Sequence, residues 1–417
     1  MTIAEQTRYL QDLIDQCPKN GTVIFPPGKY EVGSLFLKDD MTLQLNKDVI
    51  LEGSKTLDDY PLLYSRIAGI NMEWPAAVIN SIGCKNVEII GEGKIDGQGK
   101  VWWMKFWGED KQSGMLKEYT ERGWRWNVDY DCQRPRNILI QNSQQVSIKG
   151  IHSYDSGFWN LQVVYSKHVV LKDLTIKNGE GPSTDGIDID SSEDVIVDGC
   201  HVACNDDNIC VKSGRGEEAL AQNLPSKKIV IKNCRLGAGS GITLGSEVSG
   251  GIEDIQIMNN SFEGTGVGFR IKSSRNRGGY IRNILVSKLE MQNVSYPFRL
   301  MLDWFPEYSY GNAGKNIDQM PDHWKKIIAD IKGPQGLTRV SNITIKDVTA
   351  SFNDLSLSCG LFIEGNPEVP IENLKFNNCT LEVTEFGKVM GVRNIVFENM
   401  SVCIRNETQE KSHSYER

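Results

Sequence analysis

The chain has 417 residues, of which 39% are hydrophobic and 24% are charged, and its formal net charge is −8. This acidic balance argues against general binding to nucleic acid or to anionic membranes, but it is compatible with a local cationic pocket. No apolar run reaches the roughly eighteen residues of a membrane-spanning helix, so no membrane partner is expected.

Residues 2–16 predict a short amphipathic helix, because Thr2 and Glu5 have the spacing of a capping box. The apolar residues of its buried face are expected to be Ile3, Leu10, Leu13 and Ile14. Short strands broken by turns follow in residues 21–53. We therefore expect residues 1–18 to form an N-terminal cap that covers the open end of a stack of strands.

A six-residue run of alternating apolar residues then recurs along the chain, mostly at intervals in the twenties. Its copies begin at Val87, Val146, Val169, Val195, Ile229, Ile255, Ile284, Ile343, Leu374 and Ile395. A period of this length with variable additions is typical of a parallel β-helix, in which insertions fall between strands. A β-sandwich would show tighter hairpins, and a doubly wound sheet would need helical patterns between the strands. The repeat predicts an all-β solenoid that forms a single domain over residues 1–417.

Two aromatic-rich insertions, residues 99–134 and 303–338, interrupt the repeat. They contain Trp102, Trp103, Trp107, Trp124 and Trp126, and Trp304, Phe305, Tyr308, Tyr310 and Trp324. Such clusters predict local mini-cores, although in a sugar-active protein they also stack on pyranose rings or wall off a cleft. The polar tail, residues 405–417, is expected to be frayed.

The ten cysteines show no CxxC pair and no metal-like Cys/His spacing, so neither a metal nor another cofactor is expected. Cys200, Cys234 and Cys379 share one position of the repeat, which predicts a stacked row of thiols in the core. The N-terminus lacks the basic and apolar regions of a secretion signal. Together these features predict a cytoplasmic protein.

The stretch 181–214 carries two acidic sites, Asp185 and the pair Asp206-Asp207, on either side of an apolar run. If that run is one strand of the solenoid, the two sites lie on neighbouring turns, with strands about 4.8 Å apart. Carboxylates this close tend to share a proton, which suits acid/base hydrolysis. Taken singly, each aspartate is explained more simply as a turn residue.

A basic segment follows downstream. Arg270 and Lys272 alternate around Ile271, so in a strand they point to the same face, and no acidic residue occurs between Glu263 and Glu290. The segment is either a solvated charged face or a carboxylate-binding site, in which the arginine offers two donors and the lysine a point charge. Acids on two turns followed by a cationic pair suit the cleavage of an acidic polysaccharide.

With these features the chain resembles the polygalacturonase-like enzymes, family 28 of the glycoside hydrolases. The family's four motifs, Asn-Thr-Asp, Asp-Asp, Gly-His-Gly and Arg-Ile-Lys, appear in order as Ser183-Thr184-Asp185, Asp206-Asp207, Gly239-Ser240-Gly241 and Arg270-Ile271-Lys272. The resemblance implies a right-handed parallel β-helix that hydrolyses galacturonate-containing bonds of pectin or pectin-derived oligosaccharides with inversion.

The resemblance also implies residue roles. Asp206 would be the general acid, Asp185 and Asp207 would activate the water, and Arg270 and Lys272 would bind the carboxylate of a sugar next to the scissile bond. If the insertions close one end of the cleft, the action would be exo.

Two departures from the family pattern concern the substrate. Ser183 replaces an asparagine and keeps a hydrogen-bonding group, whereas Ser240, a predicted substrate-binding position, replaces a histidine and cannot titrate. A rhamnogalacturonan-directed hydrolase is therefore an alternative. Two further alternatives are a calcium-dependent β-helix lyase and a non-catalytic glycan-binding solenoid. The sequence predicts no oligomeric state.

Overall fold

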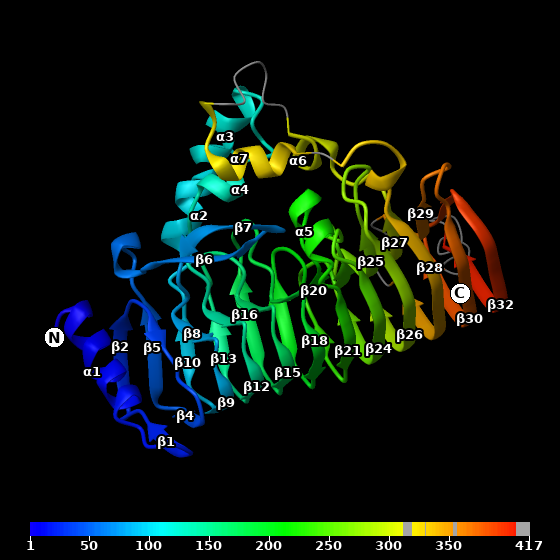
Figure 1. The fold of residues 1–417 in the computed structure, drawn as a ribbon. Coiled ribbons are helices and arrows are strands. Elements are labelled where there is room, and N and C mark those ends of the chain that lie inside the picture. The colour runs from blue at the N-terminus through cyan, green and yellow to red at the C-terminus, as the bar shows by residue number, and fades with distance from the viewer. Residues whose placement is uncertain (312–318, 330, 353–356, 406–417) are drawn as a thin grey trace, which may run out of the picture.

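The repeated apolar runs form the coils of a right-handed parallel β-helix in a computed structural model that describes residues 1–311, 319–329, 331–352 and 357–405. The strands lie side by side from the N-terminal end to the C-terminal end, as Figure 1 shows. The predicted fold is confirmed.

The larger of the two stacked sheets has 19 strands. They are β1 (Gly21–Ile24), β2 (Gly28–Val32), β4 (Met41–Leu45), β5 (Val49–Gly53), β9 (Lys85–Gly91), β10 (Lys94–Asp96), β12 (Gln144–Lys149), β13 (His152–Tyr154), β15 (Lys167–Lys172), β16 (Thr175–Gly179), β18 (Glu193–Asp198), β19 (His201–Cys204), β21 (Ser226–Lys232), β22 (Arg235–Leu236), β24 (Ile252–Glu263), β26 (Tyr280–Gln292), β28 (Arg339–Ser351), β30 (Ile371–Val383) and β32 (Val392–Ile404).

The second sheet has 11 strands and, as described below, carries the candidate site. They are β3 (Leu35–Phe36), β8 (Ile79–Ile82), β11 (Ile138–Gln141), β14 (Leu161–Val164), β17 (Ile187–Asp190), β20 (Ile209–Lys212), β23 (Ile242–Leu244), β25 (Val267–Lys272), β27 (Tyr296–Met301), β29 (Cys359–Glu364) and β31 (Glu385–Met390). An antiparallel hairpin, β6 (Leu62–Ile67) and β7 (Ile70–Pro75), stands apart from both sheets.

The predicted repeat is also the register of the larger sheet. Val146 pairs with Val169, and Val169 pairs with Val195. The same alignment continues coil by coil to Ile395, through every start position of the sequence repeat. Alternate side chains point inward and form one hydrophobic core that extends from Leu10 to Val383. This stacking is what a solenoid uses in place of a single compact core.

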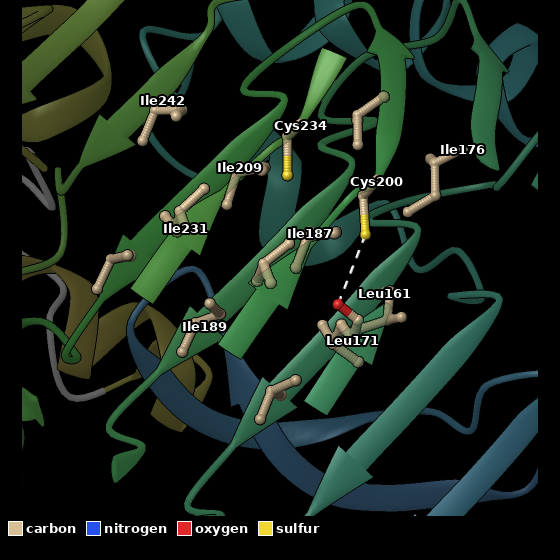
Figure 2. Packing of buried hydrophobic residues seen from close by; sticks show 14 of the residues in the cluster. Leu161, Leu171, Ile176, Ile187, Ile189, Cys200, Ile209, Ile231, Cys234 and Ile242 are labelled. Carbon is tan, nitrogen blue, oxygen red and sulfur yellow. Dashed lines mark hydrogen bonds between the residues drawn. The ribbon is translucent and has the colours of Figure 1, made fainter. Parts of the chain in front are cut away.

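Cysteines contribute to this core. Cys200 and Cys234 are fully or almost fully buried neighbours among isoleucines and leucines, and the Cys200 thiol lies near the carbonyl of Leu171 (Figure 2). Cys379 occupies the same column, but the residues between are Asn260, Leu289 and Val348. The predicted thiol row is therefore wrong as a continuous stack. The thiols of Cys200 and Cys234 are neighbours, and Cys379 is separate.

The predicted N-terminal helix is α1 (Ile3–Asp15), and its capping box between Thr2 and Glu5 is present. Leu10 and Ile14 are fully buried. The helix packs against β2 and β3 at the N-terminal end of the stack, which Figure 1 shows in blue. It covers apolar surface that the first coil would otherwise expose.

The two insertions fold mainly as short helices on one side of the solenoid (Figure 1). The first holds α2 (Lys100–Trp107), α3 (Gly114–Glu121) and α4 (Val128–Asp131), and the second holds α6 (Pro306–Ser309), α7 (Asp322–Ile328) and the 3-10 turn η3 (Gly333–Gly336). Among the described residues, two further helical elements are η1 (Leu57–Asp59) and α5 (Gly216–Gln222). Among the described residues, no helix combines the length and apolar character needed to cross a bilayer.

Trp124 and Trp126 of the first insertion and Trp324 of the second belong to a joint mini-core. The ring of Trp324 lies 5.1 Å from that of Trp124 and 5.5 Å from that of Trp126. The same cluster includes Ile67 and Trp74 of the hairpin. The mini-core interpretation is confirmed for these rings, whereas Trp102 and Trp103 belong to the main core. Of the predicted tail, residues 406–417 lie outside the described residues.

Candidate active site

The candidate site lies on the face of the second sheet that points away from the solenoid core. In β17, Ile187 and Ile189 belong to the core, so Asp188 and Asp190 point to the opposite face. In the next coil Asp190 pairs with Lys212 of β20. Ionisable side chains thus collect on one face, and the insertions cover them.

The predicted acids come together at the start of two adjacent strands. The amide of Gly186 donates to the carbonyl of Asp207 at 2.9 Å, so the two acidic sites lie on neighbouring coils. One carboxylate oxygen from each of Asp185, Asp206 and Asp207 lies within 4.8 Å of the other two. The predicted clustering of the three aspartates is confirmed.

Asp207 is fully buried and engaged by three side chains. Its Oδ1 accepts from Thr243 Oγ1 at 2.7 Å and from Arg270, and its Oδ2 accepts from Lys272 Nζ at 2.8 Å. Burial alone would raise the pKa of Asp207, but Arg270, Lys272 and Lys212 outweigh burial and hold the pKa well below its usual range. Asp207 therefore remains an anion. Arg270 and Lys272 share a face as predicted, and in this structure both bind Asp207.

Asp206 has the opposite character. Burial, and then the negative charge of Asp207, raise the pKa of Asp206 above its ordinary value. Its Oδ1 accepts from the amide of Asp207 at 2.9 Å, and its half-buried side chain lines a cavity. A carboxyl whose pKa is raised beside a fixed carboxylate is suited to general acid catalysis.

Asp188 and Lys212, to which the sequence assigned no role, complete the acid cluster. Lys212 Nζ lies 2.7 Å from Asp188 Oδ1 and 3.2 Å from Asp185 Oδ2, and it stands 3.8 Å from the ring centre of Trp159. Burial raises the pKa of Asp188 to about 7, and burial together with Asp188 raises that of Asp185 well above its usual value. In the sequence, the alternation Ile-Asp-Ile-Asp indicates that Asp188 faces away from the core, and Lys212 ends the aligned run of the next strand.

Ser240, which stands in place of the motif histidine, lies next to Asp206. Its amide donates to the carbonyl of Asp206 at 2.8 Å. The side chain of Asn208 braces this loop, because it donates to the carbonyl of Ala238 at 2.9 Å and accepts from the amide of Gly241 at 2.7 Å. The loop motif is thus positioned beside Asp206, although Ser240 does not line the cavity described next.

A cavity of about 130 Å³ lies over the acids. Its floor includes Asp185, Asp206, Lys212, Glu247 and Lys272, and its walls include Arg125, Asp129, Trp159, Ser183, Trp304, Phe305 and Tyr308. Both insertions therefore contribute side chains to the site. The other basic residues of the predicted carboxylate-binding segment do not line it. Arg275 pairs with Glu368 and Arg282 pairs with Glu253, on exposed surface.

The carboxylates of the cluster are close enough to hold a cation, and they already have countercharges. The two candidate ligand sets are Asp185, Asp206 and Asp207, and Asp185, Asp188 and Cys210. Lys212 pairs with Asp185 and Asp188, while Lys272 and Arg270 pair with Asp207. The arrangement supplies one fixed anion and carboxyls with raised pKa values, which is suited to proton transfer.

A family model and curated relatives match most of this chain. The model of the family described as glycosyl hydrolases family 28 matches residues 19–403. A probable polygalacturonase of Vitis vinifera is 28% identical over 396 residues, covering 92% of this chain and 72% of the relative. An exo-poly-alpha-D-galacturonosidase of Dickeya chrysanthemi is 25% identical, covering 83% of this chain and 60% of the relative.

Two solved structures share the fold. The hyperthermoactive exopolygalacturonase of Thermotoga maritima has a TM-score of 0.74 at 22% identity, covering 96% of this chain and 87% of that one. The family 28 exopolygalacturonase of Yersinia enterocolitica has a TM-score of 0.74 at 24% identity, covering 96% and 76%.

Proposed function

The chain belongs to family 28 of the glycosyl hydrolases, and from this premise we propose that it hydrolyses galacturonate-containing glycosidic bonds in pectin or pectin-derived oligosaccharides. The observation that carries the proposal is the contrast between Asp206, whose pKa is raised, and Asp207, which is held as an anion within 4.8 Å. Incubation with defined oligogalacturonides and detection of new reducing ends tests it. If no galacturonate oligomer yields new reducing ends, the proposed hydrolysis is refuted.

In the proposed mechanism Asp206 protonates the leaving oxygen, and Asp185 takes a proton from a water that Asp185 and Asp207 hold between them. A water that donates to two oxygens at about 2.8 Å spans about 4.6 Å between them. The oxygens of Asp185 and Asp207 lie within 4.8 Å of each other, which supports such a water. Asp207 is an unsuitable nucleophile, because Arg270, Lys272 and Thr243 already engage its oxygens.

This mechanism predicts inversion at the anomeric carbon. The nearest-oxygen separations here are shorter than the roughly 6.5–9.5 Å between carboxyl groups that is usual for inverting pairs. The proposal of inversion therefore rests on the engagement of Asp207 by its three donors and not on the spacing. Proton NMR of the first-formed product decides the point, since a product with the anomeric configuration of the substrate would contradict inversion.

We propose exo action, because both insertions and the hairpin wall the cavity on the side away from the sheet. Ala68 comes from the hairpin, Arg125 and Asp129 from the first insertion, and Phe305 and Tyr308 from the second. Such walls restrict entry to a chain end. The products of a long oligogalacturonide should be short units of one size from the first minutes, whereas a ladder of internal fragments would contradict exo action.

A rhamnogalacturonan-directed hydrolase is the second candidate, because Ser240, in the loop beside Asp206, replaces the motif histidine. A screen that includes rhamnogalacturonan fragments distinguishes the two. A β-helix lyase predicts loss of activity with a chelator and an unsaturated product that absorbs in the ultraviolet. The ion pairs of the acid cluster with Lys212, Arg270 and Lys272 favour hydrolysis, which predicts neither result.

We also propose that the enzyme works in the cytoplasm on oligosaccharides. All ten cysteines are free thiols and nine of them are buried, which supports a reducing compartment. Cell fractionation tests this point, and recovery of the protein from the culture medium would contradict it.

A further inference from the structure

Arg125 is a cation of the cavity wall that the family motifs do not account for. It lies between α3 and α4 in the first insertion, and its side chain is 23% exposed. The guanidinium carbon lies 5.4 Å from the ring centre of Phe305 in the second insertion. Arg125 therefore stands where the two insertions meet above the acids.

The charge around Arg125 is not balanced. Arg125 Nη1 lies 3.1 Å from Asp129 Oδ2. The other oxygen of Asp129 lies 3.4 Å from Arg134 Nη2 and accepts from Ser183 Oγ at 2.7 Å. One carboxylate thus faces two guanidinium groups.

Arg125 and Arg134 differ in how many of their N–H donors have partners. Arg134 is fully buried, donates to the carbonyls of Cys132 and Pro182, and packs between two phenylalanine rings. Arg125 has five N–H donors and, among the described residues, Asp129 is its hydrogen-bond partner. The other pocket cations have carboxylate partners of their own, because Lys212 pairs with Asp185 and Asp188, and Lys272 with Asp207.

We propose that Arg125 binds the carboxylate of a uronate residue where the two insertions line the cavity, with Asp129 holding its guanidinium in place. This inference rests on the proposed function and names the residue that makes the site selective for an acidic sugar. Asp129 also bonds Ser183, two residues before Asp185, so the carboxylate-binding group is tied to the catalytic loop. A sugar held by Arg125 would be fixed relative to the acids.

The test compares Arg125→Gln, Arg125→Lys and a control, Arg122→Gln. Arg122 lies three residues earlier, pairs with Glu118 and is exposed, so it does not line the cavity. Kinetics on trigalacturonate should show a KM at least tenfold higher for Arg125→Gln, with kcat within a few-fold of the unmodified enzyme, because a charge-assisted hydrogen-bond pair is lost. Arg125→Lys should fall between, and Arg122→Gln should match the unmodified enzyme.

Binding separates this inference from the proposed function. Calorimetry with free galacturonate and with galactose should show a preference for the acid in the unmodified protein and in Arg122→Gln, and no preference in Arg125→Gln. An unchanged KM and an unchanged preference in Arg125→Gln would overturn the role of Arg125. An equal loss for both sugars with a lowered melting temperature would also overturn it, since it would show a structural role. Failure of the unmodified enzyme to hydrolyse any oligogalacturonide would instead refute the proposed function.

Discussion

Asp206 is the residue on which catalysis should depend most. Asp206→Asn removes the proton donor, and we expect kcat on oligogalacturonides to fall by about 10²–10⁴-fold, the usual contribution of general acid catalysis. An aryl galacturonide with a good leaving group needs less protonation, so its hydrolysis should fall much less. An equal loss on both substrates would contradict the assignment. An unchanged melting temperature would show that the fold is intact.

The pH dependence of kcat/KM should report the two raised pKa values. In the proposed mechanism Asp185 acts as the base and must be ionised, so activity is expected to fall as the pH drops through its pKa. The acid, Asp206, must be protonated, so activity falls as the pH rises through its pKa. Both pKa values are raised, so both limbs should lie above the ordinary carboxyl range.

Lys212→Met provides a test of that profile. Lys212 favours the ionised forms of Asp185 and Asp188, and its removal should raise the pKa of Asp185 further. The acidic limb of kcat/KM should therefore move to higher pH. Lys212→Arg should keep the limb closer to its original position. An acidic limb that moves to lower pH in Lys212→Met would contradict the role of this lysine.

The sequence predicts the placement of site residues that are adjacent or that alternate within one strand. Asp206 and Asp207 are adjacent, and Arg270 and Lys272 alternate in one strand, so their common placement follows from strand geometry alone. Asp129 was not predictable, because it lies in an insertion that no repeat specifies and bonds Ser183 across 54 positions. Only the packing of the insertion brings it to the catalytic loop.

At the scale of the element, exposed asparagines form ladders at the bends of the long strands. Asn342 has a φ of 57°, donates to Asn283 at 3.3 Å and accepts from Asn373 at 3.0 Å. Asparagine tolerates this left-handed conformation better than most residues. The four coils that contain β26, β28, β30 and β32 are thereby joined by side-chain bonds at the same position.

Replacing Asn342 separates the two contributions. Asn342→Ala loses the favourable conformation and the ladder, and we expect it to lower the free energy of unfolding by about 2 kcal/mol. Asn342→Gly keeps the conformation and loses the ladder, so it should cost less, about 1 kcal/mol. Denaturant titration measures both changes. A glycine variant less stable than the alanine variant would contradict this division.

The strands differ in how far sequence predicts them. All ten predicted runs belong to the larger sheet, whose strands have one core-facing and one solvent-facing side and therefore alternate. The strands of the second sheet are short, and several are buried on both faces beneath the insertions. Their pattern mixes apolar and ionisable residues, so periodicity alone does not reveal them.

Arg215 connects the elements that cover the site, which are the hairpin and both insertions. Its backbone amide donates to the carbonyl of Gly69 in the hairpin turn at 2.8 Å. Its guanidinium donates to Tyr130 Oη and to the carbonyl of Ser309, each at 2.9 Å, and to the carbonyl of Ile327 at 3.3 Å. One buried side chain thus joins both insertions.

Arg215→Ala should loosen these insertions while leaving the coils in place. We expect a lower melting temperature. Because the insertions would then restrict entry to the cavity less, we also expect internal fragments among the products of a long oligogalacturonide. Arg235→Ala, on the exposed face of β22, is the control and should change neither property. If Arg215→Ala still releases products of one size, the proposed dependence of exo action on the two insertions is contradicted.

The helix α1 closes the end of the stack that is synthesised first. A ribosome releases the chain from its N-terminus, so the closed end is complete before the later coils exist. Each new coil can then join a finished edge, and within the stack of coils each strand pairs with a strand already translated, whereas the contacts between the two insertions form later. Figure 1 shows the same order in space, because the colours run from blue to red along the stack. The direction of translation and the direction of assembly coincide, which favours vectorial, co-translational folding of the solenoid.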